Sequence, residues 1–164
     1  MFYNPEKIES VGVLFNELES CKGVAQDPIH HPEGNVFTHC VQALNCAMRE
    51  SNDIDLIFAA MLHDVGKRIE SHGHEAWSIK ILDGKISEKT EWLIKNHMRF
   101  WTFMLGDMKK HSKVKALTDH PWFKDLVMLC RWDKMAHNSN MVCCYDRVKI
   151  INQLKLSMMS GLVS

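Results

Sequence analysis

Residues 56–67 read LIFAAMLHDVGK, and this stretch is the most informative part of the sequence for predicting the fold. Its first seven residues are apolar in succession, which predicts a helix that is central and buried on most sides. Asp53 stands where a helix cap is expected, and Gly66 is placed as a C-terminal stop. The buried helix therefore ends directly on two ionisable side chains, His63 and Asp64.

Outward from this stretch, the apolar periodicity is helical almost everywhere. One helix begins at the cap Asn4-Pro5 and runs to about Leu18, another carries apolar residues from Phe37 to Met48, and Pro121 opens a late one. Further helices are expected at about 74–83, 87–98, 112–117 and 142–156, with a loop at about 22–34 and no clear assignment for 99–111. No strand alternation of useful length is visible. The sequence predicts an all-α helical bundle that forms a single domain over residues 1–164.

The composition is that of an ordinary soluble globule. Hydrophobic residues make up 46% and charged residues 24%, which excludes disordered and fibrous classes. Twenty basic and twenty acidic residues give zero formal net charge, so any contact with nucleic acid must be local. No apolar run approaches the roughly 18 residues of a membrane span, and no secretory signal is visible. Six cysteines without a Cys-x-x-Cys pair indicate a reducing, cytoplasmic compartment.

Several ionisable side chains stand where the helical pattern calls for apolar ones. Asp133 follows Leu126 and Leu129 at helical spacing, so it lies on the core-facing stripe of its helix. His39 and His97 likewise face inward from two other helices. A buried, unpaired carboxylate costs several kcal/mol or takes up a proton, so Asp133 needs a cation or a strong hydrogen-bond partner.

One divalent cation would explain all of these groups together, because it compensates buried carboxylates and takes neutral imidazole nitrogens as ligands. Each residue alone has a simpler explanation. A single inward histidine is more often a satisfied core histidine than a ligand. Asp133 alone could pair with Arg131, Lys134 or Arg147. The case for a metal site therefore rests on the combination.

The combination resembles the HD superfamily of metal-dependent phosphohydrolases. The likeness is carried by His39, by the His63-Asp64 pair at the end of an apolar helix, and by Asp133 far downstream. Segments 31–39 (HPEGNVFTH), 72–76 (HGHEA), 96–99 (NHMR) and 129–133 (LCRWD) resemble, more closely, the HD domain that follows the catalytic head of bacterial tRNA nucleotidyltransferases. The likeness covers roughly residues 20–140 and the head is absent, so a freestanding HD domain is expected.

The resemblance implies a set of metal ligands. The residues that would bind a first divalent ion are His39, His63, Asp64 and Asp133. In relatives with two ions the aspartate of the HD pair bridges them and two further histidines join. The matching histidines here are His97 and His74, with His72 as an alternative to His74.

The resemblance also implies phosphate-binding residues. Lys67, after the HD pair, would contact phosphate, so Asp64 and Lys67 are the expected catalytic residues. The alternative for Lys67 is a solvated lysine beside a helix end. Arg99 and Arg131 could contact phosphate too, or pair at the surface. Trp101 and Phe103 could stack on a nucleobase or pack in the core.

The implied function is a metal-dependent phosphohydrolase, a phosphomonoesterase or phosphodiesterase, acting on nucleotides or on RNA-end phosphates such as 2′,3′-cyclic phosphates. Mixed His/Asp ligation suits one or two ions of Mn, Fe, Co, Ni, Zn or Mg. The expected partners are small phosphorylated substrates or an RNA end, with no membrane and no obligate protein partner indicated. Two alternatives remain. One is a non-catalytic module that binds nucleic acid or a partner around a structural metal, and the other is a di-iron oxygenase-like enzyme that needs His74 and His97 as ligands.

Overall fold

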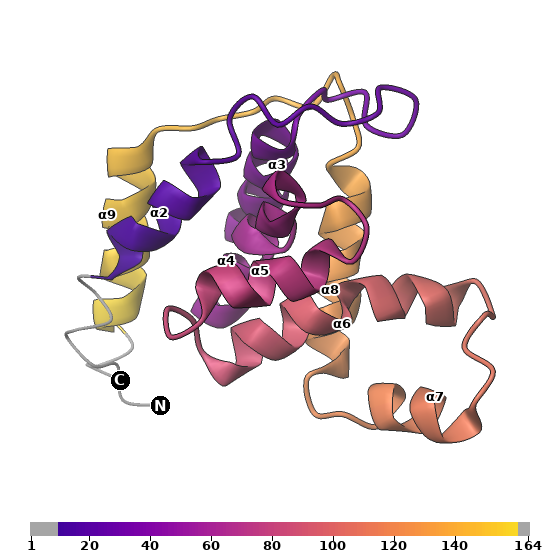
Figure 1. The fold of residues 1–164 in the computed structure, drawn as a ribbon. Helices are drawn as coiled ribbons and strands as arrows, with labels where there is room; N and C mark the ends of the chain where they lie inside the picture. Colours follow the sequence, from indigo (N-terminus) through magenta and orange to yellow (C-terminus); the bar gives the residue numbers. More distant parts are fainter. Residues whose placement is uncertain (1–9, 161–164) are drawn as a thin grey trace.

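The computed structural model describes residues 10–160, and the elements found there are helical (Figure 1). They are α2 (Val11–Glu19), α3 (Val36–Glu50), α4 (Ile54–Leu62), the 3-10 turn η1 (Val65–Arg68), α5 (His74–Leu82), α6 (Glu88–Met104), α7 (His111–Thr118), α8 (Phe123–Met135) and α9 (Arg147–Ser160). Within 10–160 the only β pairing is an isolated bridge between Ala25 and Asn35. The all-α prediction is confirmed, whereas the cap predicted at Asn4-Pro5 lies outside the described residues.

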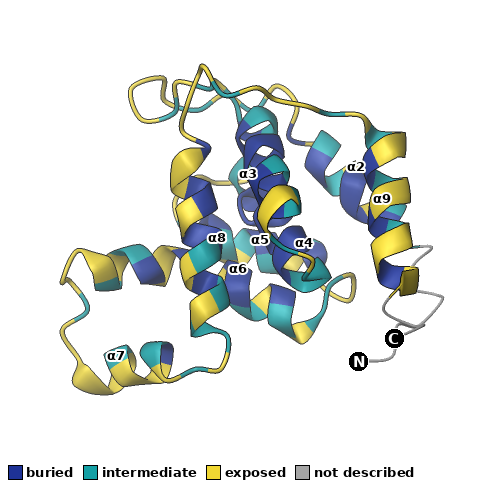
Figure 2. Cartoon of the chain, turned by 180° about the vertical axis from the view of Figure 1, so that it is seen from behind, coloured by how far each residue is buried: buried dark blue, intermediate teal, exposed yellow. Residues whose placement is uncertain are grey.

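Helix α4 is the centre of the bundle, as its apolar run predicts. Every residue of 56–62 is buried, and α2, α3, α6 and α8 pack around this helix. Figure 2 shows buried residues concentrated on α3 and α4, whereas α7 is largely exposed. The Asp53 carboxylate accepts hydrogen bonds from the backbone N–H groups of Asp55 and Leu56, which confirms the predicted cap.

The predicted role of Gly66 as a helix stop is wrong. Helix α4 ends at Leu62, and Gly66 lies beyond it in η1, where a Cβ would collide with the carbonyl oxygen of His74 and with Ser78 on α5. The Ser78 hydroxyl donates to the His63 carbonyl at 3.0 Å and accepts from the Gly66 N–H at 2.9 Å. Because Gly66 has no side chain, α5 can pack closely against the turn that carries His63 and Asp64.

Two segments differ from the sequence prediction. Residues 99–104, which had no assignment, continue α6 because Phe100 is buried and its ring centroid lies 6.4 Å from that of Phe123 on α8. The last helix begins at Arg147 rather than at 142. The backbone of Cys144 instead pairs with the side-chain amide of Asn45 through hydrogen bonds of 2.9 and 3.0 Å, which holds this segment across α3.

Among residues 10–160, no helix has both the length and the apolar character needed to cross a bilayer.

Candidate metal centre

Three buried side chains from three helices meet at one point. The Nε2 atom of His39, in the first turn of α3, lies 3.2 Å from Nε2 of His63, which caps the end of α4. The Oδ1 atom of Asp133, near the end of α8, lies 3.0 Å from the first of these nitrogens and 3.4 Å from the second. All three residues are buried. We call this group the first cluster.

Two more histidines meet nearby and form what we call the second cluster. His74, the first residue of α5, and His97, on α6, bring their Nε2 atoms to 3.1 Å from each other. Oδ1 of Asp64 lies 2.9 Å from Nε2 of His74 and 3.7 Å from Nε2 of His97.

Asp64 lies between the two clusters and faces each with a different oxygen. Its Oδ2 atom is 3.5 Å from Nε2 of His39 and 3.6 Å from Nε2 of His63, while its Oδ1 atom faces the second cluster. Asp64 directly precedes η1, so the packing of α5 against η1 fixes its position. The carboxylate therefore joins two groups of ligand atoms.

Each of the four histidines turns its Nδ1 atom toward a fixed acceptor. The acceptors are Glu33 Oε1 at 3.1 Å for His39, and the carbonyls of Ala60 at 3.0 Å for His63, Ser71 at 2.9 Å for His74 and Ile94 at 2.5 Å for His97. Since Nδ1 must donate to these oxygens, a neutral imidazole keeps its lone pair on Nε2. In each cluster two such lone pairs face each other, which is an arrangement that requires a cation or an added proton between them.

The donor set fits a divalent ion at each cluster. Ligand bonds of about 2.0–2.1 Å place neighbouring ligand atoms roughly 3.0–3.4 Å apart, and most of the separations above lie close to this range. The hydrogen bond on Nδ1 is the outer contact that commonly orients a ligating histidine. The structure thus brings together all six ligands that the resemblance implies, and His74 rather than His72 is the residue that contacts Asp64.

The surroundings of both aspartates favour their ionised form. Burial raises the pKa of Asp64, but the nearby His63 and the Lys67 ammonium outweigh it and hold that pKa well below its usual value. Burial likewise opposes ionisation of Asp133, but the neighbouring His137 imidazole and the hydrogen bond to His39 hold its pKa well below the usual value. Two buried anionic groups next to one another are the setting in which a divalent cation is stabilising.

Lys67 lies beside the clusters rather than in solvent. Its Nζ atom is 2.6 Å from Oδ2 of Asp64 and 2.9 Å from the side-chain oxygen of Gln26. Burial lowers the pKa of Lys67, but the Asp64 carboxylate outweighs burial and raises it. The amine therefore stays charged at the edge of the site, where it can meet an anionic substrate.

A pocket of about 440 Å³ opens over the second cluster and reaches the first cluster at Asp133. Its lining includes Asp64, Lys67, His74, His97, Trp101 and Asp133. The indole Nε1–H of Trp101 donates to Oδ2 of Asp133 at 3.3 Å, so this ring orients the carboxylate and also forms part of the pocket wall. The structure thus gives Trp101 a place at the site.

Arg99 and Arg131, both candidates for phosphate contact, do not line this pocket. Arg131 is exposed and pairs with Glu50. Arg99 follows His97 by two residues on α6, and at 3.6 residues per turn it points to the other side of that helix, where it lines a second cavity. Arg99 and Arg131 are each two residues from a metal-ligand candidate in sequence, but both point to another side of their helices than that ligand does.

Sequence reasoning missed Glu33 and His137. Oε1 of Glu33 accepts from Nδ1 of His39 at 3.1 Å and from Nδ1 of His31 at 2.9 Å, and its side chain is fully buried. Burial raises the pKa of Glu33, but these hydrogen bonds lower it to about 2. His137 Nε2 lies 3.6 Å from Oδ1 of Asp133. Glu33 lies among turn residues that resemble a solvated loop, so nothing in the sequence indicated its burial. His137 follows Asp133 by four residues, and this helical spacing could have indicated that the two side chains are neighbours.

Residues 36–133 match the HD domain family, which is more than half of the chain, and the chain therefore belongs to this family. Proteins called Multifunctional CCA protein are similar to it. The one from Halorhodospira halophila is 43% identical over 56 residues, which are 34% of this chain and 14% of that protein. The one from Thioalkalivibrio sulfidiphilus is 38% identical over 80 residues (44% and 20%), and the one from Nitrosospira multiformis is 30% identical over 129 residues (72% and 30%).

These comparisons confirm the resemblance to HD domains and to the HD region of CCA-type tRNA nucleotidyltransferases. The chain spans less than a third of the length of each of the three relatives named.

Proposed function

We propose that this chain is a metal-dependent phosphohydrolase, a phosphomonoesterase or phosphodiesterase, that acts on nucleotides or RNA-end phosphates such as 2′,3′-cyclic phosphates. The observation that carries the proposal is Asp64, whose two oxygens face two separate groups of buried imidazoles. Such a carboxylate suits two ions held close together, which is a common arrangement for phosphoester hydrolysis. The CCA proteins among its relatives support an RNA end as the substrate class, and six free thiols support a cytoplasmic location.

When bound, divalent ions would supply an activated water and polarise the phosphoryl oxygens. The chain itself holds the ligands in fixed orientation through the Nδ1 contacts and through the Trp101–Asp133 hydrogen bond. Lys67 places a positive charge at the pocket, where it would neutralise a phosphoryl oxygen. A volume of about 440 Å³ admits the end of a strand or a mononucleotide.

Metal analysis of the purified protein, coupled to a phosphoester screen, tests this proposal. The screen includes 2′,3′-cyclic nucleotides, mononucleotides and 3′-phosphorylated RNA. We expect Asp64→Ala and His63→Ala to lose phosphate release by at least 100-fold while circular dichroism stays that of a helical protein. Full activity in both variants would reject the proposal.

The same measurements separate the two alternatives. Full metal occupancy with no turnover over the whole screen would favour a binding module with a structural metal. The presence of both His74 and His97 beside Asp64 also meets the ligand requirement of a di-iron oxygenase-like enzyme. That function predicts bound iron and oxygen consumption, which an oxygen electrode measures directly.

A further inference from the structure

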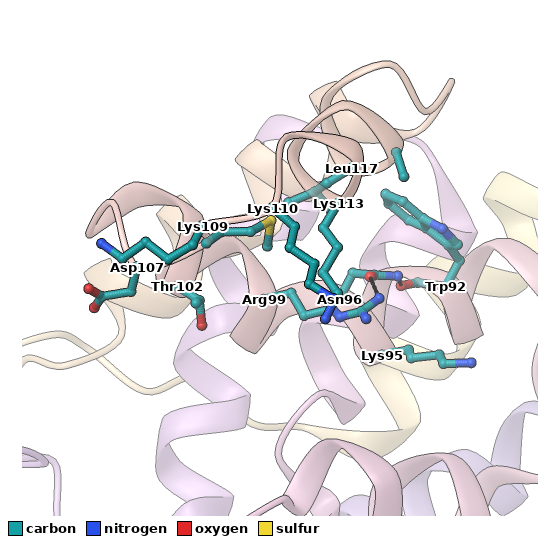
Figure 3. A pocket seen from close by; sticks show the side chains of 12 residues that line it. Trp92, Lys95, Asn96, Arg99, Thr102, Asp107, Lys109, Lys110, Lys113 and Leu117 are labelled. Atoms are coloured by element: carbon teal, nitrogen blue, oxygen red, sulfur yellow. Dashed lines mark hydrogen bonds between the residues drawn. The ribbon is translucent and has the colours of Figure 1, made fainter.

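A second cavity, separate from the metal pocket, lies between α6 and the α7 segment (Figure 3). Its volume is about 590 Å³. Five of its twelve lining residues are basic, and the acidic side chain there is Asp107. The basic residues are Lys95, Arg99, Lys109, Lys110 and Lys113. In a chain whose formal net charge is zero, this is a local concentration of positive charge.

The charges converge without an acidic partner. In Figure 3, Lys110 and Lys113 reach from the α7 side toward Arg99 on α6. In the part of the chain that the structure describes, no ion pair joins any of these three to a carboxylate. Like charges held together repel one another, so an anion between them is stabilising. Three such donors facing one space are the arrangement that binds phosphate oxygens.

The cavity also has a fixed frame. Oδ1 of Asn96, a buried residue, lies 3.4 Å from Nη1 of Arg99 and accepts its hydrogen bond, while the Asn96 amide nitrogen donates to the Trp92 carbonyl at 2.8 Å. The Trp92 ring lines the cavity and stacks on His120, with centroids 3.9 Å apart and planes 15° from parallel. A held guanidinium beside a held aromatic ring combines the two contacts that proteins use on single-stranded nucleic acid.

Helix α6 is the wall between this cavity and the metal pocket. His97 and Trp101 line the metal pocket, whereas Lys95, Arg99 and Thr102 line the second cavity. A helix with its side chains is about 10 Å across, so a molecule that fills both spaces must pass over α6. A mononucleotide fills one of them, but a strand can occupy both.

We propose that the α6–α7 cavity binds the phosphate backbone of an RNA strand whose end lies in the metal pocket, an inference that rests on the proposed function. Figure 3 shows Lys109 and Lys95 extending to opposite sides of the converging trio. The positive charge is therefore a band along the cavity, which suits successive phosphates better than a single one. The cavity would select strands over mononucleotides as substrates.

The test compares two pairs of substitutions that remove the same charge. Lys110→Gln/Lys113→Gln alters the cavity, whereas Lys115→Gln/Lys124→Gln removes two exposed lysines that do not line it. Fluorescence anisotropy measures the binding of a short, 3′-phosphorylated single-stranded RNA at several salt concentrations. At 0.1 M salt we expect the cavity pair to bind about 25-fold more weakly, with a salt slope smaller by about 1.4, and the control pair to bind like the wild type.

Two results would overturn this proposal. One is equal RNA binding by the two pairs, and the other is ATP displacing the RNA as effectively as unlabelled strand, which would make the cavity a mononucleotide site. Hydrolysis of 2′,3′-cyclic AMP tests the proposed phosphohydrolase function separately from RNA binding. We expect Lys110→Gln/Lys113→Gln to leave this hydrolysis rate unchanged. Should the wild type hydrolyse no phosphoester while its RNA binding still depends on these lysines, the phosphohydrolase function fails and the cavity's RNA binding stands.

Discussion

The chemistry of single side chains at this site depends on which ring nitrogen each histidine presents. For His39 the nearer acceptor of Nδ1 is Glu33, a buried carboxylate at 3.1 Å, and the Ala136 carbonyl lies at 3.4 Å. The other three histidines use backbone carbonyls, which no substitution removes. Glu33 is therefore the one side chain, among residues 10–160, through which the Nδ1 contact of a first-cluster histidine can be altered directly.

We predict that Glu33→Gln weakens metal binding by about 10- to 100-fold, the usual cost of losing a partner behind a ligating histidine. Glutamine keeps an oxygen for His39 Nδ1 but lacks the negative charge that makes Nε2 a better donor. Competition with a chromophoric chelator measures the metal dissociation constant. Glu91→Gln, on an exposed part of α6, is the isosteric control and should bind metal like the wild type. An unchanged constant in Glu33→Gln would show that Glu33 only fills space.

The residues that could be predicted from the sequence are those on regular helices. His39, His97 and Asp133 replace apolar residues in a 3.6-residue pattern, so their inward direction follows from the period alone. Glu33 could not be found in this way because it lies in a loop, where no period relates position to burial. Its partner is set by how the 22–34 loop folds over α3, which is a tertiary property.

Packing between elements decides whether Asp64 reaches both clusters. The turn at η1 touches α5 so closely that Gly66 has no room for a Cβ, and Ser78 bonds to both sides of this turn. From the sequence, Gly66 could be interpreted only as a helix stop. Its actual role depends on a close contact with α5, a helix that begins eight residues later, at His74. The same limit applies to α6, whose last turns are stabilised by the Phe123 ring at the start of α8.

We predict that Gly66→Ala destabilises the fold by about 1–3 kcal/mol, the usual cost of overpacking, and weakens binding of the second ion. The added methyl group would push α5 away, and His74 would move with it. Thermal unfolding and metal stoichiometry measure the two effects. Gly12→Ala is the matched control, since this glycine lies within α2 and the nearest atom to its added Cβ is Nη2 of Arg147 at 3.8 Å. The control should be neutral or slightly stabilising. Equal melting temperatures for both variants would contradict the prediction.

Across the whole molecule, the bundle has an apolar core that does not depend on the metal. Residues such as Phe15, Leu44, Met61 and Trp132 are fully buried apolar side chains of this core. The clusters lie where α3, α4, α5, α6 and α8 come together, so ions bound at the two clusters would together link five helices. We therefore expect the metal-free chain to be folded but less stable than the metal-bound one.

The stability of the metal-free chain and its affinity for metal should both depend on pH, and the protonation of His39 gives the sign of each effect. Burial disfavours its charge, but hydrogen bonds to Asp133 and Glu33 outweigh burial and raise the pKa from 6.5 to about 10. The metal-free folded state thus holds a proton that the unfolded chain releases above pH 6.5, and the stability from that proton is lost as the pH rises toward 10. A metal ion must displace the same proton, so its affinity rises with pH.

We predict that saturating Mn²⁺ or Zn²⁺ raises the melting temperature, and raises it more at pH 8.5 than at pH 6.5. An ion at 100 times its dissociation constant adds about 2.7 kcal/mol, which for a chain of this size corresponds to roughly 5–10 °C. Differential scanning calorimetry with and without a chelator measures the rise at each pH. In His74→Ala/His97→Ala, which removes the second cluster, the rise should persist but shrink, because the ligands of the first cluster remain. A rise that is absent in the wild type, or larger at pH 6.5, would mean that protons rather than metal ions fill the space between the imidazoles.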